Sequence, residues 1–418
     1  MDRRKMLKAS GLAALGLGFT GCASRTPSLL QPATKPRIQL ASLNASWNRV
    51  IRTTVGLRPY RPSGFVVRAE KLDNKTLVHN YGHGGAGHSL AWGTGSLAAD
   101  LVSEAATQGD RRVAVLGCGT VGLTAARQLQ RRGFEVTIYT LSIPPNTTSN
   151  KAWAGFTPAS RAVAIGGRTP AWDTQFRQAV EISYQQLQLL VGPNYGITWI
   201  DDYAMTDELR ESRSAEARAE EARLLPAHMQ MGTELLGPGE HPFPSTYVNR
   251  GTRMRIEPSI YLEALVRDVT QFGGRIVIRK FDTLHDLMSL TEPIVVNSTG
   301  LGSRTLFGDE ELTPVKGQLT FLVPQPELNY ILFGFLRNSE GSLMPITVMP
   351  RRDGIALGTT GERGVWTLEP NEESRRRTVE AHIALSNIMR SPRPHTVVAR
   401  SQRLGKVPAL ETFFDLES

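Results

Sequence analysis

Cysteine is nearly absent from this sequence, which has only Cys22 and Cys118 in 418 residues. If Cys22 is removed with a leader or acylated, no intrachain disulfide can form, so the chain shows no disulfide framework. A basic stripe interleaved with aromatic residues is also missing, because the lysines and arginines behind the net charge of +9 are scattered. We therefore expect no nucleic-acid partner. The 40% hydrophobic and 21% charged residues are ordinary for a soluble globular protein, and the length is sufficient for two connected domains.

The apolar stretch near the N-terminus is too short to cross a membrane. It spans residues 11–21, whereas a transmembrane helix needs about 20 apolar residues. Arg3 and Arg4 stand directly before it, and this pattern resembles a twin-arginine export signal. The sequence therefore predicts a signal peptide over residues 1–22.

The end of this leader also resembles a lipoprotein cleavage box, residues 19–22 (FTGC). We expect either lipidation of Cys22, and with it membrane attachment, or ordinary cleavage nearby. Residues 23–45 are rich in Ser, Pro and Thr and are predicted to form a linker. The expected location is outside the cytoplasm, in the periplasm or as a membrane-anchored lipoprotein on the cell envelope.

A complete set of metal ligands is missing as well. His79, His83 and His88 are close in the sequence, but no acidic residue or cysteine stands with them to complete a site. The sequence predicts no bound metal.

A strand, a glycine-rich turn, a helix and a second strand follow one another within residues 111–140. The first strand is an apolar run typical of a buried parallel strand, and the turn is GCGTVG, residues 117–122. Gly117 permits a tight turn, Gly119 lets the backbone approach a pyrophosphate, and Gly122 lets the helix pack closely on the strand. The helix N-terminus offers free N–H groups to phosphates. This pattern indicates a dinucleotide-binding βαβ unit, and the alternative is a glycine-rich structural turn.

The acidic residue that holds the adenosine ribose in many such units is missing. The second strand ends with Tyr139 and Thr140 instead, which argues against NAD and leaves FAD open. Another apolar strand, residues 293–296, runs into the small-residue loop 297–302 (NSTGLG). In open α/β sheets, ligands bind at such carboxyl ends of strands.

Several segments together resemble the D-amino acid oxidase family of flavoproteins, over roughly residues 46–390. The matching segments are the βαβ unit 113–139, the diphosphate and flavin loop 146–155, residues 279–281 at the adenine, the second cofactor loop 296–300, the crossing segment 314–318, and residues 349–354 and 357–360 of the hairpin beside the substrate.

Two of the most specific segments stand in an unusual place. Residues 55–62 (VGLRPYRP) resemble the family segment with the substrate-carboxylate arginine, and residues 78–93 resemble its closing FAD loop and helix. In the family both lie near the C-terminus, whereas here they precede the βαβ unit. The chain also ends soon after the predicted helix 372–389, which normally leads into them. We interpret this order as a circular permutation, which costs little where chain termini lie close together.

The resemblance implies an α/β fold, with a Rossmann-like FAD-binding domain and a second α+β substrate domain built on an antiparallel sheet. The expected divisions are the displaced C-terminal segment 46–106, the FAD-binding βαβ unit 107–160, a substrate-domain part 161–250, an FAD-domain part 251–310, a substrate-domain part 311–395 and a tail 396–418.

FAD is the implied cofactor. The predicted helix 89–102 would direct its N-terminus at the flavin and stabilise the negative charge of the reduced form. The residues expected to bind FAD are Gly84, Gly85, Ala86, Gly87, His88, Ser89, Gly117, Gly119, Thr120, Val121, Gly122, Thr147, Thr148, Ser149, Ala154, Gly155, Phe281, Ser298, Thr299 and Gly300.

The family's reaction transfers a hydride from the substrate carbon to the flavin, and water hydrolyses the resulting imine. The resemblance assigns Arg58 to the substrate carboxylate and the Gly85 carbonyl to the substrate amine. An ordinary surface salt bridge is the alternative role for Arg58, and Arg61 is expected to be structural. Thr347 and Leu343 stand where the family often has tyrosines facing the substrate. Thr347 can still donate a hydrogen bond, whereas Leu343 offers only apolar contact.

The missing phenols leave the substrate open among an uncommon D-amino acid, an N-substituted amino acid and another amine. The expected electron acceptor is oxygen, giving peroxide, or a membrane quinone if the protein is lipid-anchored. Two other classes stay open. A NAD-linked dehydrogenase shares the glycine turn but leaves residues 82–89 and 297–302 unexplained. A flavin-binding protein without turnover would explain the missing tyrosines.

Overall fold

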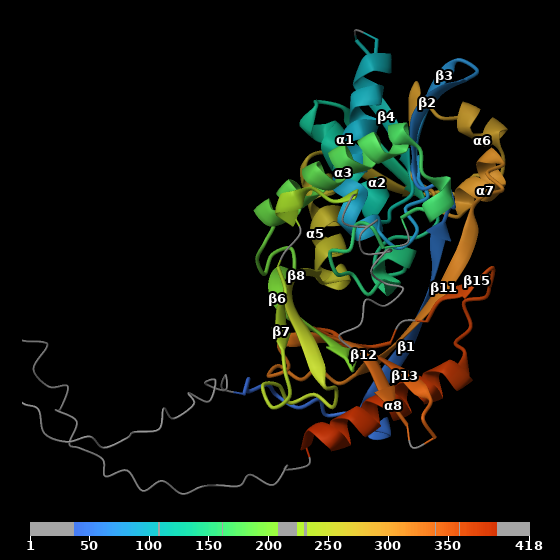
Figure 1. Ribbon diagram of the computed structural model, residues 1–418. Helices are drawn as coiled ribbons and strands as arrows, with labels where there is room; N and C mark the ends of the chain where they lie inside the picture. Colours follow the sequence, from blue (N-terminus) through green and yellow to red (C-terminus); the bar gives the residue numbers. More distant parts are fainter. Residues whose placement is uncertain are drawn as a thin grey trace, which may run out of the picture. The chain divides into compact units, whose positions relative to one another are not determined.

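The computed structural model describes residues 37–107, 109–160, 162–207, 224–229, 232–338, 340–358 and 360–390. The predicted signal peptide, the FTGC box, most of the predicted linker and the predicted tail lie outside these residues. The described chain from Ile38 onward belongs to one compact unit, and its strands form one sheet of six strands and one of nine (Figure 1).

The six-stranded sheet, named the parallel sheet below, has the order β2-β3-β10-β4-β5-β9 within the described residues. All neighbouring strands in it are parallel except β2 and β3. Strand β3 is buried along its whole length although it includes His79 and Asn80. The strands are β2 (Val66–Leu72), β3 (Lys75–Tyr81), β4 (Arg112–Leu116), β5 (Glu135–Thr140), β9 (Arg275–Ile278) and β10 (Ile294–Asn297).

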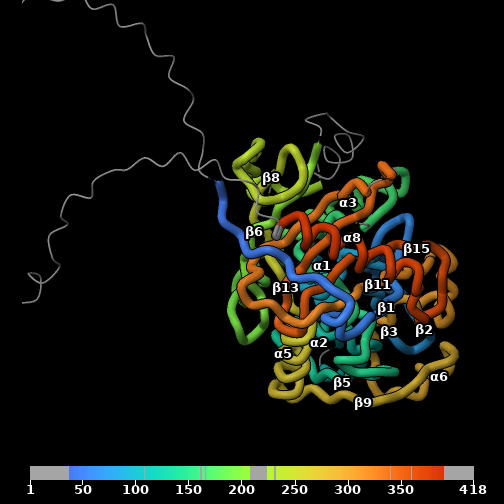
Figure 2. Tube along the Cα trace, turned by 90° about the horizontal axis from the view of Figure 1, so that it is seen from below, coloured from blue at the N-terminus to red at the C-terminus, as the bar shows by residue number. Residues whose placement is uncertain are grey.

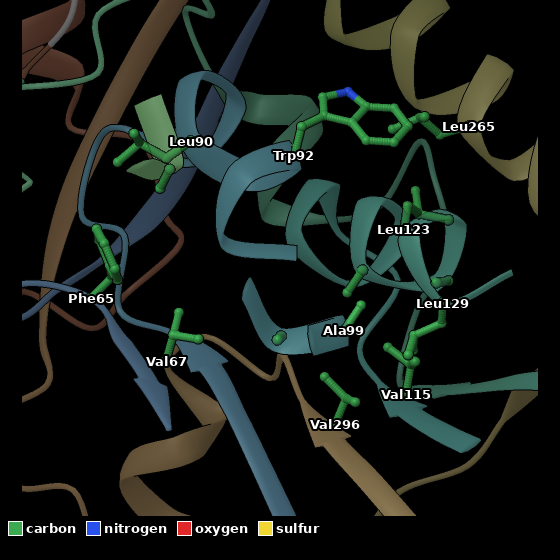
Figure 3. Close-up of a cluster of buried hydrophobic side chains, with 14 of the residues drawn as sticks. Phe65, Val67, Leu90, Trp92, Ala99, Val115, Leu123, Leu129, Leu265 and Val296 are labelled. Atoms are coloured by element: carbon green, nitrogen blue, oxygen red, sulfur yellow. The ribbon is translucent and has the colours of Figure 1, made fainter. Parts of the chain in front are cut away.

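Helices cover both faces of the parallel sheet. On one face, Trp92, Leu123 and Leu265 from three different helices point into a shared core (Figure 3). On the other face, Leu287 and Leu306 pack against the strands. The helices of the first face are α1 (Gly87–Ala105), α2 (Thr120–Arg131), α3 (Pro170–Leu189) and α5 (Pro258–Gln271), those of the second face are α6 (Leu284–Met288) and α7 (Gly302–Phe307), and short 3-10 turns are η1 (Trp47–Arg49), η2 (Thr148–Lys151), η3 (Ile165–Gly167) and η4 (Ala227–Met229).

Helix α3 belongs to the layer of the parallel sheet, so the expected assignment of residues 161–250 to the substrate domain is wrong for this helix. A methyl group on Gly93 of α1 would overlap the backbone of Ala179 in α3. The Gly93 N–H also donates to Ser183 Oγ at 2.8 Å. Because glycine lets the two backbones approach closely, α3 is fixed against α1 rather than against the other sheet.

The nine-stranded sheet, named the mixed sheet below, has the order β1-β11-β14-β13-β12-β6-β8-β7, with β15 paired to β11, within the described residues. Its pairs are antiparallel apart from β12 and β6. The predicted fold class, an α/β domain with a second, mostly antiparallel sheet, is confirmed. The strands are β1 (Val50–Tyr60), β6 (Ile197–Thr206), β7 (Glu234–Leu236), β8 (Tyr247–Ile256), β11 (Thr313–Leu322), β12 (Tyr330–Arg337), β13 (Leu343–Arg351), β14 (Gly354–Leu357) and β15 (Glu362–Arg363).

Helix α8 (Glu372–Arg390) covers the face of the mixed sheet that points away from the parallel sheet (Figure 1). Leu43 and Ala45, 1% and 4% exposed, share this core. Ser386 Oγ donates to the Leu43 carbonyl at 2.6 Å, and Figure 2 shows this segment running beside α8. The linker expected over residues 23–45 is therefore wrong at its C-terminal end, because burial of an apolar side chain such as Leu43 keeps residues 38–45 in the fold.

Residues 46–106 supply parts of both sheets. Strand β1 pairs with β11 over its length, from Val50 opposite Leu322 to Tyr60 opposite Thr313. Strand β3 lies between β2 and β10, and pairs with β10 in parallel. Helix α1 follows β3 directly and packs between α2 and α3.

Candidate cofactor and substrate site

A cavity of about 970 Å³ has the carboxyl ends of the parallel strands on one side and a face of the mixed sheet on the other. The turns that follow β3, β4, β5 and β10 line the first side. Side chains of β1, β6, β8, β12 and β13 line the second. The carboxyl ends of strands are the usual ligand-binding edge of an open α/β sheet.

The glycine turn between β4 and α2 has the geometry of a phosphate-binding turn. Gly117 has a φ of 107°, a conformation that side-chain-bearing residues rarely adopt. A Cβ on Gly122 would overlap the carbonyl oxygen of Gly117, the residue after β4, so only glycine lets α2 lie this close to the turn. The Thr120 N–H donates to Ser149 Oγ at 3.0 Å. The N-terminus of α2 begins at Thr120 and opens on the cavity, where it can hold an anionic ligand.

The loop of residues 147–155 is held by two hydrogen bonds from the mixed sheet. Ala154 has a φ of 59°, rare for a residue with a side chain, and its carbonyl accepts from Ile256 N–H at 2.9 Å. Arg351 Nη1 donates to the Ala152 carbonyl at 3.1 Å. Both contacts come from strands of the mixed sheet, so this loop connects the dinucleotide turn to the opposite wall of the cavity.

Residues 46–106 bring a glycine loop next to the strand that carries Arg58. Gly84 has a φ of 57°, and its N–H donates to the Pro59 carbonyl at 2.9 Å. Gly85 is exposed and lines the cavity. Helix α1 begins at Gly87, so its N-terminus opens on the same space.

Two histidines beside this loop are buried and neutral. His83 Nε2 lies 2.8 Å from Thr94 Oγ1, and His88 Nε2 donates to the Ser149 carbonyl at 3.0 Å. Burial lowers the pKa of His83 to about 3 and that of His88 to about 4. His88 thus links α1 to the loop of residues 147–155 without adding a charge.

The loop after β10 is shaped by the side chain of Asn297. Its Oδ1 accepts from Thr299 N–H at 3.1 Å and from Thr299 Oγ1 at 2.7 Å. Its Nδ2 donates to Ser303 Oγ at 3.0 Å and lies 3.1 Å from His79 Nδ1. This network lets Gly300, with a φ of 58°, turn the chain into α7 at the cavity edge.

The aromatic end of the cavity lies beside β5. Phe281 packs edge-on against Tyr139, with ring centroids 5.8 Å apart, and the Arg279 guanidinium stands 4.8 Å from the Phe281 ring centroid. All three residues line the cavity. A flat aromatic ligand such as adenine fits this surface.

Arg58 lines the cavity from β1. Its Nη1 donates to the Thr360 carbonyl at 3.2 Å, and its guanidinium lies against Gly317 of β11. Arg61, expected to be structural, forms ion pairs with Asp309 at 2.8 Å and Glu311 at 2.5 Å outside the cavity lining.

Thr347 lines the cavity from β13, and His382 of α8 fixes its backbone. His382 Nδ1 donates to the Thr378 carbonyl at 2.7 Å, so Nε2 accepts from Thr347 N–H at 3.2 Å. The expectation that Leu343 faces the substrate is wrong. Leu343 is 54% exposed and does not line the cavity, because four residues along a strand span about 13 Å.

An ion pair that the sequence did not reveal also lines the cavity. Arg253 Nη2 of β8 lies 2.7 Å from Asp202 Oδ2 of β6, and the Arg253 guanidinium stands 5.2 Å from the Phe333 ring centroid. Phe333 is the partner of Thr347 across β12 and β13. No motif marks these residues, because strand pairing brings together positions 51 apart in the chain.

The structure brings nearly all predicted site residues to one cavity. Ala86, Ser89 and Gly122 are the exceptions, since they lie just behind its surface. Ser89 Oγ there accepts from Thr157 N–H at 2.8 Å. The predicted residues that line it are Arg58, Gly84, Gly85, Gly87, His88, Gly117, Gly119, Thr120, Val121, Thr147, Thr148, Ser149, Ala154, Gly155, Phe281, Ser298, Thr299, Gly300 and Thr347.

Fold and cavity together define a protein built on two sheets with a dinucleotide-binding turn at the cavity between them. Residues 112–395 match the sequence model of a family described as "DAO: FAD dependent oxidoreductase". The match covers more than half of the chain, and the protein belongs to this family. It is therefore an FAD-dependent oxidoreductase of the amino acid and amine oxidase type.

Two sequence relatives and one solved structure are among the proteins similar to this chain. The chain is 27% identical over 269 residues to a D-amino-acid oxidase of Rubrobacter xylanophilus, covering 62% of this chain and 72% of the relative. It is 26% identical over 277 residues to the human D-aspartate oxidase, covering 66% and 75%. A solved glycine oxidase from Geobacillus kaustophilus aligns with a TM-score of 0.48 and 15% identity, over 67% of this chain and 79% of that one.

The residues present fit FAD. The glycine turn offers an anion site, and the buried hydroxyl of Ser298 at the cavity has no partner in the described parts of the chain. Those parts contain no group of three His, Cys, Asp or Glu residues able to hold a metal. Among the helices described, none has the length and apolarity to cross a membrane.

Burial raises the pKa of the Cys118 thiol in the turn to about 12, so it stays protonated.

Proposed function

We propose that this enzyme oxidises the C–N bond of a D-amino acid or a related amine to an imine. FAD, when bound, supplies the acceptor for the hydride that leaves the substrate carbon. The chain itself binds the substrate and orients it. The relatives named D-amino-acid oxidase and D-aspartate oxidase support this class of substrate.

One observation carries the proposal: the hydrogen bond from Gly84 N–H to the Pro59 carbonyl, 2.9 Å long. It joins the residue after Arg58 to the residue before Gly85. Arg58 and the exposed residue Gly85 are thereby held close together in the chain fold, and both line the cavity. An α-amino acid presents a carboxylate and an amine one carbon apart, which suits this pair of groups.

The roles follow from the chemistry of each group. The Arg58 guanidinium binds the carboxylate through its planar fork. The Gly85 carbonyl accepts from the substrate amine and so turns the Cα–H toward the cofactor. Thr347 offers a hydroxyl and Phe333 an apolar surface to the rest of the substrate.

The test is turnover by Arg58→Ala, measured as anaerobic flavin bleaching with a panel of D-amino acids. We expect kcat/KM for carboxylated substrates to fall by about 10²–10³-fold, the usual effect of removing one partner of a buried charge pair. For an amine without a carboxylate, kcat/KM should be the same for Arg58→Ala as for the parent. Arg363→Ala is the matched control, because Arg363 is exposed and lies outside the cavity lining. Unchanged turnover of carboxylated substrates by Arg58→Ala would contradict the clamp.

The electrons pass on to oxygen, giving peroxide, or to a membrane quinone if Cys22 is lipidated. The two routes separate in a reoxidation experiment with the bleached enzyme. Rapid recovery of the flavin absorbance in air supports oxygen. Slow recovery in air with fast recovery on adding a soluble quinone supports the membrane route.

We infer that the order of segments is a circular permutation of the family fold. The family match begins at Arg112, yet residues 46–106 fill positions inside both sheets. Ser42 Oγ donates to the Met389 carbonyl at 3.3 Å, so the end of α8 touches the chain just before residues 46–106. A direct connection there would be short, which supports the inference.

A rearranged gene tests it. The new chain begins just before β4, continues to Met389, joins Leu43 through a short flexible linker, and ends after α1. We expect a soluble yellow protein with the FAD affinity of the parent. A rearranged chain that neither folds nor binds flavin would overturn the permutation.

The proposed location is outside the cytoplasm. It rests on the paired arginines Arg3 and Arg4 and on the box that ends at Cys22. Fractionation of cells that express the protein with Arg3→Lys/Arg4→Lys tests the signal, and the variant should remain in the cytoplasm. Cys22→Ser should release the protein from the membrane fraction if Cys22 carries the lipid.

A further inference from the structure

Asn80 is a buried polar residue at the cavity that none of the roles above uses. It lies near the end of β3, has 0% exposed surface and lines the cavity. Within the described residues, neither its amide nitrogen nor its amide oxygen has a hydrogen-bond partner. Leaving a buried amide without partners costs free energy, so a native protein retains such a group where a ligand satisfies it.

The position of Asn80 follows from the pairing of β3. The ladder between β3 and β10 ends with His79 opposite Asn297, so Asn80 is the first β3 residue beyond β10. It shares a sheet face with Val78, which packs in the core with α1 and α2. Its side chain therefore lies on the side where the N-termini of these two helices open.

The order of the parallel strands places parts of FAD along the sheet. The aromatic surface for adenine lies beside β5 and the phosphate-binding turn follows β4. Strands β10 and β3 come next, and the glycine loop at Gly84 and Gly85 follows β3. The part of FAD between the pyrophosphate and the flavin ring is the ribityl chain, so it passes over β10 and β3.

The unpartnered amide nitrogen and oxygen of Asn80 suit a ribityl chain in that place. A phosphate only accepts hydrogen bonds and would leave the amide oxygen of Asn80 unsatisfied. A ribityl hydroxyl both donates and accepts, so two neighbouring hydroxyls can satisfy Oδ1 and Nδ2 together. The Ser298 hydroxyl, also buried without a partner in the described part of the chain, adds a third group of the same kind.

We propose that Asn80 binds the ribityl hydroxyls of FAD. The role concerns the cofactor alone and does not depend on the substrate assigned above. It also distinguishes Asn80 from Thr120 and the glycine turn, which face the pyrophosphate.

The test is the dissociation constant of FAD for the full-length chain, measured by quenching of flavin fluorescence. Asn80→Leu, similar in size and without polar atoms, should raise this constant by about 10- to 100-fold, the loss of one to two buried hydrogen bonds. The dissociation constant of riboflavin should rise by the same factor. Lumiflavin, which lacks the ribityl chain, should bind Asn80→Leu as it binds the parent. So should ADP, which lacks both ribityl and flavin and whose affinity is measured by competition with FAD.

A purely structural role predicts a different pattern. Without FAD, Asn80→Leu should keep or raise the urea midpoint, because it removes an unsatisfied buried amide; a lowered midpoint would overturn the proposal. Unchanged FAD affinity would overturn it as well, and so would an equal loss for ADP. Asn329→Leu, at an exposed loop position outside this cavity, is the matched control. Since FAD binding by the parent is measured in the same experiment, failure of the proposal leaves the enzyme's class untouched.

Discussion

The Arg58 guanidinium lies flat against Gly317, so that a Cβ on Gly317 would overlap both of its Nη atoms. The two residues come from paired strands, in which Gly56 is opposite Gly317 and Arg58 is opposite Val315. The arginine reaches its place in the cavity wall because position 317 carries no side chain. Gly317 is thus as much a part of the cavity wall as Arg58.

Gly317→Ala should displace Arg58 while leaving the dinucleotide turn intact. We expect kcat/KM for carboxylated substrates to fall by about 10²-fold, as a displacement of about 1 Å can do, and the flavin content to stay at the parent level. Steady-state kinetics and the flavin-to-protein absorbance ratio measure the two effects. Gly166→Ala is the control, since nothing lies within 4 Å of its Cβ position. Equal kinetics for Gly317→Ala and the parent would show that Arg58 tolerates displacement.

The Arg253–Asp202 pair at the cavity wall makes an electrostatic prediction. Arg253→Met leaves the Asp202 carboxylate, 13% exposed, without its partner beside an anionic substrate. We expect KM for carboxylated substrates to rise by about tenfold, and Arg253→Met/Asp202→Asn to recover most of the loss. Steady-state kinetics of the single and double variants measures the coupling.

The same two strands offer a matched control. Arg250 and Asp201 form a similar ion pair, 2.7 Å long, and neither residue lines this cavity. Arg250→Met should leave KM within about twofold of the parent, as surface ion pairs contribute little. If both variants raise KM alike, the effect comes from strand pairing rather than from charge in the cavity.

Close packing of α1 on α3 predicts a stability effect. Gly93→Ala forces a methyl group into the backbone of Ala179, so the free energy of unfolding should fall by about 1–3 kcal/mol or more. Urea denaturation followed by circular dichroism measures it. Ser103→Ala, at an exposed position of the same helix, should change stability by less than about 0.5 kcal/mol. A Gly93→Ala protein as stable as the parent would mean that α3 can move away from α1.

Buried histidines make stability depend on pH. The pKa of His88 is lowered to about 4 by burial, whereas an unfolded histidine has a pKa of about 6.5. The stabilisation is therefore complete above pH about 6.5 and is lost as the pH falls toward 4, because the unfolded chain takes up the proton first. The shift corresponds to about 3 kcal/mol. His83, with its pKa lowered to about 3, acts in the same direction.

Urea denaturation at pH about 7.5, 6 and 5 measures this dependence. His88→Gln can still donate to the Ser149 carbonyl but does not titrate, so its stability should fall less steeply with pH. His285→Gln, at an exposed position, should follow the parent. Parallel curves for His88→Gln and the parent would exclude His88 as a source of the dependence.

The sequence predicted the parts of the fold that depend on local signals. The turn at Gly117, Gly119 and Gly122 has a fixed spacing that only a few backbone conformations satisfy, and the flanking strand and helix follow from it. The family resemblance added Arg58 and the loop at Gly84, because both belong to short local motifs that can be read wherever they stand in a chain.

Features made by distant contacts could not be predicted. From the sequence alone, Leu43 falls in a predicted polar linker. In the structure, α8 covers it. Leu343 was expected at the substrate because alignment to a hairpin does not reveal how far along the strand the cavity reaches. Asp202 and Arg253 meet only because β6 and β8 pair. Asn80 faces the cavity beyond the end of β10 only because the pairing of β3 with β10 stops at His79.

The pairing of β1 with β11, and of β3 with β10, has a consequence for synthesis of the protein. Residues 50–81 leave the ribosome early, yet their partners end at Asn297 and Leu322. Neither sheet can be completed until about seven tenths of the chain has been made, so these strand edges stay unpaired during much of translation. Folding should be slow and largely post-translational, as expected for contacts of long sequence separation. A nascent chain stalled before Thr313 should accordingly depend on chaperones to stay soluble.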